Sequence, residues 1–200
     1  MQYDASGTPS SRGRLIFLMG PSGSGKDSLI DASRERLAEY GVEVARRVIT
    51  RSPEAKGESA LGVTPERFEA MRAAGAFVLN WAANGLCYGI SAQVQECLAA
   101  GRSVLVNGSR GYLQEARRRY PDLLAVGLTV LPDVLRQRLT ARGRESAEEI
   151  EQRLARGTRL QAYDASVHVL DNSAALDEAV EALFDVLRAE GVIGQAKGKD

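Results

Sequence analysis

Short apolar runs of strand length alternate along the chain with longer stretches in which apolar residues recur at helical spacing. The apolar runs predict strands, which we expect at 14–20, 42–50, 103–108, 123–131 and 166–170, with two further short strands within 76–90. The amphipathic stretches predict helices at 26–40, 65–75, 91–101, 109–119, 132–142, 146–161 and 174–190. Because strands alternate with helices, we expect an α/β fold in which helices cover both faces of a parallel sheet.

Local signals mark several element boundaries. Thr64 is a suitable helix N-cap because a proline follows it at the first helical position. Ser146 and Glu149 have the spacing of a capping box. Asn84-Gly85 is a favoured two-residue turn, so it predicts a hairpin within 76–90.

Composition and charge indicate one globular domain of ordinary make-up. The 200 residues are 44% hydrophobic and 26% charged, with a formal net charge of zero, so general attraction to nucleic acid is not expected. Cys87 and Cys97 lack the spacing of a metal site. Because no signal sequence and no run of membrane-span length is recognisable, we expect a cytoplasmic protein without a membrane partner. We also expect a disordered tail at 1–13 and a frayed tail at 193–200.

The segment "GPSGSGKDS" (20–28) is nearly a phosphate-binding loop, or P-loop. It follows an expected strand and precedes an expected helix, so glycine-rich backbone N–H groups and a helix start would surround a phosphate. The predicted ATP-binding residues of this loop are Gly20, Pro21, Ser22, Gly23, Ser24, Gly25, Lys26, Asp27 and Ser28. Lys26 would contact the β- and γ-phosphates, whereas a plain glycine turn would leave this lysine unexplained.

Asp27 occupies the position at which a P-loop ordinarily has the hydroxyl that binds Mg²⁺. An acidic residue suits the first turn of a helix, but that gain is only about 0.3–1 kcal/mol. Repulsion between unit charges about 4 Å apart is about 4 kcal/mol at an effective dielectric of 20, so a carboxylate near a triphosphate favours a bound cation. We therefore predict that Asp27 is a Mg²⁺ ligand. Ser28 is the weaker candidate, because one helical step rotates it by about 100°.

Several further stretches resemble guanylate kinases in sequence and in order. They are "ITRSP" (49–53), "YGIS" (88–91), "VLVNG" (104–108) and "RLTARGRESAEEIEQRL" (138–154), all following the P-loop. The resemblance implies a P-loop nucleoside-monophosphate-kinase-like fold within 14–192, an acceptor-binding region at about 42–90 and a helical lid at about 138–157. It also implies that Arg51 binds the acceptor's phosphate.

The same resemblance assigns the lid arginines to ATP. Arg142, Arg144 and Arg153 would close over the nucleotide, and the implied catalytic set is Lys26, Arg51, Arg142 and Arg153. The chain has 22 Arg and 4 Lys. A general preference for Arg explains part of that excess but not the placement of these residues, and Arg offers two-pronged contacts to phosphate.

Three departures from guanylate kinases argue against GMP as the acceptor. Glu54 replaces their second acceptor arginine, Asn80 replaces the glutamate that reads guanine, and Asn107 replaces a strand-end aspartate. Guanine presents N–H donors to a carboxylate, and a buried unmet donor costs about 1–3 kcal/mol. The aspartate gained at 27 and lost at 107 would leave the number of carboxylates around the metal unchanged.

"LMGPSGSGKDSL" (18–29), "VLVNGSR" (104–110) and "RGRE" (142–145) are similar to the ribose 1,5-bisphosphate phosphokinase family. That resemblance implies ATP-dependent phosphorylation of the 1-phosphate of ribose 1,5-bisphosphate to phosphoribosyl diphosphate, in phosphonate breakdown. The candidate acceptor residues are Arg51, Trp81, Tyr88, Asn107 and Arg110; core packing is an equal alternative for Trp81 and Tyr88.

The chemistry fits a phosphate acceptor independently of the resemblance. A phosphate monoester has a second pKa near 6, so it is largely a dianion at neutral pH and needs no general base. The single histidine, His168, lies in an expected strand. The alternatives are a GMP kinase, a non-catalytic guanylate-kinase-like binding module and, less favoured, a GTPase; dimerisation is left open.

Overall fold

The computed structural model describes residues 13–51, 60–143, 146–159 and 163–194. Residues 1–12 and 195–200, which make up most of the two expected tails, lie outside this description. Its centre is a five-stranded sheet in the order β2-β7-β1-β8-β9, and every pairing in it is parallel. The strands are β1 (Leu15–Met19), β2 (Glu43–Val44), β7 (Val104–Asn107), β8 (Leu124–Thr129) and β9 (His168–Asp171). The expected parallel sheet is therefore confirmed.

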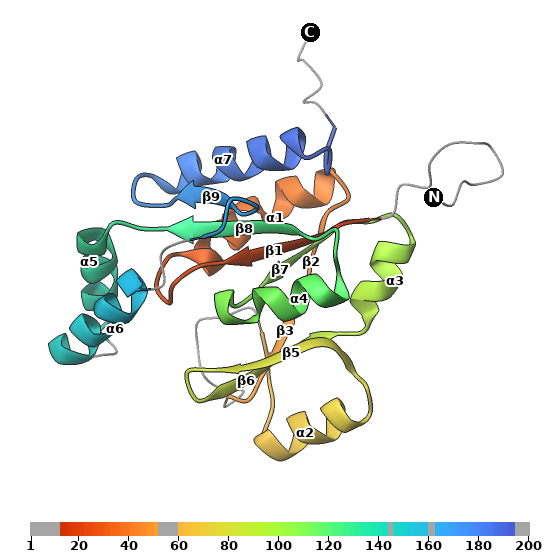
Figure 1. Ribbon diagram of the computed structural model, residues 1–200, viewed down its shortest axis with the longest axis horizontal. Helices are drawn as coiled ribbons and strands as arrows, with labels where there is room; N and C mark the ends of the chain where they lie inside the picture. The colour runs from red at the N-terminus through yellow and green to blue at the C-terminus, as the bar shows by residue number, and fades with distance from the viewer. Residues whose placement is uncertain (1–12, 52–59, 144–145, 160–162, 195–200) are drawn as a thin grey trace, which may run out of the picture.

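Helices cover both faces of this sheet, as Figure 1 shows. One face packs against α1 (Lys26–Glu39) and α7 (Leu176–Ala189), and the other faces α3 (Gln93–Ala99) and α4 (Leu113–Arg119). Side chains of β1 alternate between the two cores: Ile16 and Leu18 join the α1–α7 core, and Phe17 joins the other. This alternation follows from the two-residue period of a strand that is buried on both faces.

A second, four-stranded sheet has the order β4-β3-β6-β5. It consists of β3 (Arg47–Ile49), β4 (Leu61–Gly62), β5 (Phe77–Ala83) and β6 (Leu86–Ser91), with α2 (Pro65–Ala73) beyond it in Figure 1. The hairpin β5–β6 turns at Asn84 and Gly85, whose φ angles of 51° and 74° fit the expected two-residue turn.

Two expectations about this region are wrong. The strand expected at 42–50 is two strands in different sheets, because Glu43 pairs with Val104 of β7 whereas Arg47 pairs with Ile90 of β6. In addition, β4 lies in a stretch expected to be a loop, where it pairs with β3. In both cases the partner strand decides the outcome, and the partner is distant in sequence.

The helix signals are confirmed. The Thr64 hydroxyl accepts a hydrogen bond from the backbone N–H of Arg67, and Ser146 and Glu149 bond reciprocally at the start of α6 (Ala147–Arg159). The region in which a lid is expected consists of α5 (Pro132–Arg142) and α6, called the lid below, and the two helices share a small core of their own. None of the described helices is both long and apolar enough to cross a membrane.

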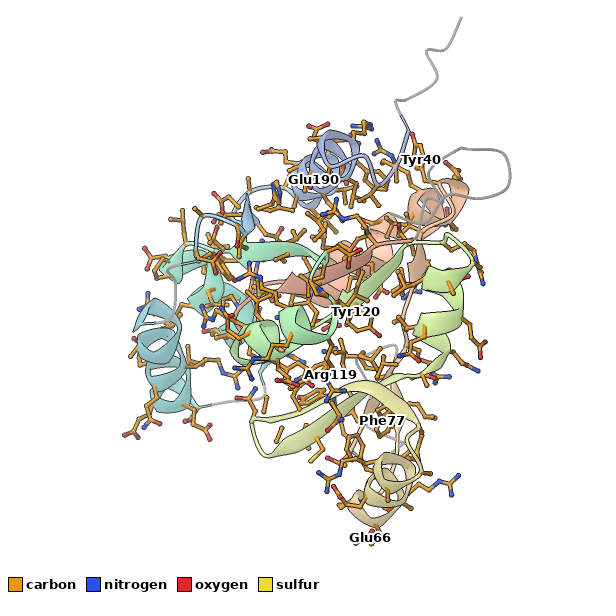
Figure 2. The ribbon with its side chains drawn as sticks, turned by 45° about the vertical axis from the view of Figure 1, so that its right-hand side comes forward. Tyr40, Glu66, Phe77, Arg119, Tyr120 and Glu190 are labelled. Atoms are coloured by element: carbon orange, nitrogen blue, oxygen red, sulfur yellow. The ribbon has the colours of Figure 1, made fainter. Side chains whose placement is uncertain are left out.

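The end of the helix expected at 109–119 contacts the second sheet through Arg119. A short 3-10 helix at Arg110–Tyr112 precedes α4 here. Arg119 donates a hydrogen bond to the carbonyl of Val78 at 2.9 Å, and Figure 2 shows Arg119 where α4 lies over β5. Arg119 therefore ties α4, which packs on the central sheet, to β5 of the second sheet.

Candidate active site

A cavity of about 760 Å³ lies at the carboxyl ends of the central strands, between the P-loop, the lid and the second sheet. This is the edge at which open α/β sheets bind ligands. The residues lining it include Gly20, Ser22, Gly23, Gly25, Lys26, Asp27, Ser28, Arg47, Trp81, Tyr88, Gly108, Arg138, Arg142 and Asn172. Most of the predicted ATP-binding residues therefore meet at one cavity.

The P-loop has the backbone shape that a phosphate cradle requires. Gly23 and Gly25 have φ angles of 88° and 86°, a conformation that side chains beyond glycine rarely adopt. Helix α1 begins directly after Gly25, at Lys26. The Lys26 ammonium donates hydrogen bonds to the carbonyls of Gly20 and Pro21, at 2.9 Å each, so its charge lies over the loop.

Asn172, directly after β9, braces the P-loop and is a residue that the sequence analysis missed. Its side-chain nitrogen donates to the Ser24 carbonyl at 2.7 Å, and Asn172 is only 2% exposed. A Cβ on Gly25 would lie 2.5 Å from that nitrogen, so the loop and the asparagine fit only with glycine there. The available signal was its position at the end of a strand.

Asp27 is bonded from two sides. The side-chain nitrogen of Asn107 donates to its Oδ1 at 2.7 Å, and the Arg47 guanidinium donates to the same oxygen at 3.1 Å. Asp27 and Asn107, the positions at which a carboxylate is gained and lost relative to guanylate kinases, are thus in direct contact. Arg47 is the second residue that sequence analysis missed, because "VEVARRVIT" reads as one strand and does not indicate where its arginines face.

The surroundings of Asp27 fit a Mg²⁺ ion that is held mainly by phosphate oxygens. Among the described residues, the other carboxylate oxygen of Asp27 has no hydrogen-bond partner. No group of three or more acidic, His or Cys residues able to hold a metal occurs in the described part of the chain. Mg²⁺ commonly uses one or two carboxylates and takes its remaining ligands from phosphates and water, which this arrangement allows.

Aromatic side chains form the wall of the cavity opposite the P-loop. Trp81 and Tyr88 are paired across β5 and β6, and their rings stack 5.5 Å apart at 7°. Tyr112 packs against Trp81 at 5.5 Å, and the Arg47 guanidinium lies 5.7 Å from the Tyr88 ring centre. Trp81 is only 9% exposed, so this residue combines core packing with a place at the cavity edge.

The lid reaches the P-loop through arginine. Arg153 donates a hydrogen bond to the Ser22 hydroxyl at 2.9 Å, and Arg142 lines the cavity. Arg138 also lines it, and its buried Nη1 has no hydrogen-bond partner among the described residues. Arg138 opens the segment at 138–154, but its sequence position alone did not predict a role for it. Arg144 lies outside the described residues, as does Glu54.

Three predicted acceptor residues, Arg51, Asn107 and Arg110, are not among the residues that line this cavity. Arg51 lies two residues beyond the end of β3, and Arg110 lies after β7 with its guanidinium 5.9 Å from the Tyr163 ring centre. Burial raises the pKa of Tyr163, and the nearby Arg110 charge opposes this effect. The structure thus places Asn107 against Asp27 and sets Trp81 and Tyr88 in the cavity wall, whereas Arg51 and Arg110 lie outside the lining.

The segment that returns from the lid is held to α4 by charge. Arg117 donates to both carboxylate oxygens of Asp164, at 2.9 and 3.3 Å. Together with hydrogen bonds from Ser166, this contact holds the pKa of Asp164 well below its ordinary value. Arg117 therefore anchors the chain where it leaves the lid.

The fold and this phosphate-binding site define a class of kinase, and comparison with known proteins agrees. The sequence pattern of the guanylate kinase family matches residues 12–190. The crystal structure of guanylate kinase from Anaplasma phagocytophilum superposes with a TM-score of 0.66 at 19% identity, covering 94% of this chain and 89% of that one. The chain therefore belongs to the guanylate kinase family.

Within this family, the chain groups with the ribose 1,5-bisphosphate phosphokinases. It is 62% identical over 176 residues to ribose 1,5-bisphosphate phosphokinase PhnN of Azotobacter vinelandii, covering 88% of this chain and 96% of the relative. It is 63% identical over 173 residues to the protein of the same name from Pseudomonas paraeruginosa, covering 86% and 94%. The resemblance inferred from the sequence is confirmed.

Proposed function

We propose that the chain transfers the γ-phosphate of ATP to the 1-phosphate of ribose 1,5-bisphosphate, giving 5-phosphoribosyl 1-diphosphate and ADP. The observation that carries this proposal is the 62% identity to ribose 1,5-bisphosphate phosphokinase over most of both chains. The absence of a guanine-reading carboxylate at Asn80 supports it further. The reaction would serve phosphonate breakdown and act in the cytoplasm, where ATP is available.

On the nucleotide side, the P-loop backbone and Lys26 would bind the β- and γ-phosphates of ATP. The positive end of α1 adds to their attraction for anions. Arg142 and Arg153 in the lid would cover the phosphates, which is consistent with the contact between Arg153 and Ser22. Arg144 would join them from the same segment.

On the acceptor side, the region at about 42–90 would bind the sugar bisphosphate. Trp81 and Tyr88 form an aromatic wall there, against which the sugar ring would pack. Arg51 and Arg110 would bind acceptor phosphate from the margin, and this role requires them to move toward the cavity when substrate binds. Asn107 would hold Asp27 in position through its 2.7 Å hydrogen bond.

The chemistry demands neutralisation of charge more than proton transfer. The attacking oxygen belongs to a phosphate that is already largely a dianion near neutral pH. It forms a bond to the γ-phosphorus while the bond to the ADP oxygen breaks, and positioning and charge stabilisation account for most catalysis in such transfers. Lys26 and the arginines supply that positive charge. Because the acceptor phosphate is already largely deprotonated, no side chain need remove a proton.

Asp27 would hold Mg²⁺ through the oxygen that Asn107 and Arg47 leave available. When bound, the ion neutralises phosphate charge and fixes the orientation of the triphosphate. Asp27 itself keeps a carboxylate oxygen beside the P-loop. Its hydrogen bond from Asn107 orients that carboxylate.

The test is phosphorus NMR of a reaction containing ribose 1,5-bisphosphate and Mg-ATP, with GMP offered in a parallel sample. We expect a new diphosphate signal and ADP only with the sugar bisphosphate. Lys26→Ala, which removes the P-loop charge, is the inactive control. Absence of the diphosphate signal with the wild-type chain would overturn the proposal, and ADP release with GMP would favour a guanylate kinase.

A further inference from the structure

Arg47 is the arginine of the second sheet that lies closest to the ATP side of the cavity. Its side chain is 11% exposed, it lines the cavity, and its guanidinium contacts Asp27 of α1 at 3.1 Å. The same guanidinium lies 5.7 Å from the Tyr88 ring centre. Arg47 therefore spans from the acceptor side of the cavity to the first turn of the helix that follows the P-loop.

The strand register explains this placement. In the antiparallel pair, Arg47 lies opposite Ile90 and Ile49 lies opposite Tyr88. Arg47 and Tyr88 are thus diagonal neighbours on one face of the sheet, within reach of a long side chain and an aromatic ring. Val48, which lies between Arg47 and Ile49 in β3, points to the other face and packs with Phe68 and Phe77. The alternation of β3 directs Arg47 into the cavity.

The chemistry of this position favours an anion. A guanidinium has five donors in a planar fork that matches phosphate, and here it is fixed from two directions, by a carboxylate at one edge and an aromatic ring nearby. Fixing a long side chain in advance lowers the entropy that ligand binding would otherwise cost. A salt bridge that served stability alone would not require a place in the wall of an anion-binding cavity.

We propose that Arg47 binds the acceptor phosphate that receives the transferred group, with Asp27 and Tyr88 positioning its guanidinium. This inference rests on the proposed function and adds a residue to it. The reacting phosphate is the one that must approach ATP, and Arg47 is in contact with Asp27 beside the P-loop. Asp27 lies in the first turn of α1, on the nucleotide side, and its Oδ1 accepts a hydrogen bond from Arg47. Asp27 thereby connects the nucleotide side to the acceptor side.

The test compares Arg47→Ala, Arg47→Lys and the matched control Arg46→Ala. Arg46 is the adjacent arginine, is exposed, and within the described part of the chain donates to the carbonyl of Ala60 alone, at 3.3 Å. Steady-state KM values are measured for ribose 1,5-bisphosphate and for Mg-ATP, with the melting temperature of each variant. Dissociation constants of ribose 1-phosphate and ribose 5-phosphate, measured by calorimetry without ATP, provide a readout that does not depend on turnover.

We expect Arg47→Ala to raise the KM for the bisphosphate and the dissociation constant of ribose 1-phosphate by roughly 10- to 100-fold, the range for loss of a charge-assisted hydrogen bond. The affinity for ribose 5-phosphate should change by less than about twofold, since Arg47 is assigned to the other phosphate. The KM for Mg-ATP should rise less than the KM for the bisphosphate, because Arg47 acts on the nucleotide side only through Asp27. Arg47→Lys should show a smaller loss because it keeps the charge without the fork. Arg46→Ala should match the wild type.

Several results would overturn the inference. Equal rises in both KM values, a lower melting temperature with unchanged acceptor affinity, or a loss confined to ribose 5-phosphate would each assign Arg47 another role. If Arg47→Ala does not fold, the same criteria apply to Arg47→Lys. Failure of the proposed function has a different signature, because wild-type enzyme would then not turn over ribose 1,5-bisphosphate at all.

Discussion

Asn107 donates a hydrogen bond to Oδ1 of Asp27 at 2.7 Å, joining the end of β7 to the first turn of α1 across 80 positions of sequence. The contact explains why the two residues depart together from the guanylate kinase pattern that the chain otherwise resembles. An amide donor satisfies a carboxylate, whereas a second carboxylate at position 107 would repel it.

The first prediction follows from that contact. Asn107→Asp should lower kcat/KM at low Mg²⁺ by roughly 100-fold, or about 2.7 kcal/mol. Two carboxylates about 4 Å apart repel by about 4 kcal/mol at an effective dielectric of 20, and solvent at the half-exposed Asp27 screens part of that repulsion. The double variant Asp27→Ser with Asn107→Asp restores one carboxylate and should recover at least about tenfold over the single variant, about 1.4 kcal/mol. Activity is measured over a range of Mg²⁺ concentrations.

The Asp27→Asn variant is the control for the metal in this series. It keeps the size of the side chain but removes the charge, so it should require more Mg²⁺ for half-maximal activity. Full Mg²⁺-dependent turnover in Asp27→Asn would contradict the assignment of Asp27 as a metal ligand. A double variant no better than Asn107→Asp would contradict the exchange of carboxylate positions.

The second prediction concerns the brace beneath the P-loop. Asn172→Leu removes the donor to the Ser24 carbonyl, and a buried carbonyl left without a partner costs about 1–3 kcal/mol. We expect lower stability to urea and weaker ATP binding, with acceptor binding unchanged. Gln95→Leu, which changes an exposed amide, should leave stability to urea and ATP binding unaltered. Unchanged ATP affinity in Asn172→Leu would show that the loop holds its shape without the brace.

A pair of neighbouring arginines gives the third prediction. Arg118 and Arg119 both contact Glu115, at 3.2 Å each, but only Arg119 also donates to the Val78 carbonyl. Arg119→Ala should lower the free energy of unfolding by about 1 kcal/mol more than Arg118→Ala, the usual net worth of one hydrogen bond. Urea unfolding of both variants measures the difference, and equal losses would mean that the Val78 contact contributes nothing.

The fourth prediction is a pH dependence at the lid's return segment. The pKa of Asp164 lies below its ordinary value of 3.8 because Arg117 and Ser166 stabilise the carboxylate. A lowered pKa gives stability that is present above the unfolded value and lost as the pH falls through the folded one. Arg117→Met should therefore be less stable than wild type to the same extent near pH 7 and near pH 5, with a smaller difference near pH 3.

Urea unfolding at these three pH values checks the prediction. The exposed pair at Arg34 and Asp31, 3.3 Å apart, offers a control in Arg34→Met, whose effect should be small at every pH because exposed pairs contribute little. A stability difference between wild type and Arg117→Met that grows on acidification would contradict a lowered pKa of Asp164 in the folded state.

Much of the central fold could be predicted because its signals are local. Three strands of the parallel sheet, β1, β7 and β8, lie in short apolar runs, and the glycines with Lys26 indicate the P-loop within nine residues. The buried positions of α1 agree with the helical spacing of Leu29, Ile30 and Leu37. Such features depend on neighbours along the chain, so a sequence displays them directly.

The second sheet and its arginine could not be predicted in the same way. The segment at 42–50 has strand character throughout, and only its partners, β7 for Glu43 and β6 for Arg47, reveal that it divides between two sheets. The break between β2 and β3 decides which way Arg47 faces, so the contact between Arg47 and Asp27 could not be predicted from the sequence either. Asn172 was missed for the same reason, since its partner Ser24 lies 148 positions away.

The hairpin that carries Trp81 and Tyr88 has a consequence for the order in which the molecule folds. Its two strands are joined by a two-residue turn, so they find each other by closing a short loop, and hairpins form within roughly 1–10 μs. Strand β1 must instead meet β8, pairing Ile16 with Leu124, and closing so long a loop costs more entropy. The aromatic wall is thus set to form early, while the sheet that presents the P-loop is still assembling. Trp81, the chain's single tryptophan, would report that early step by its fluorescence.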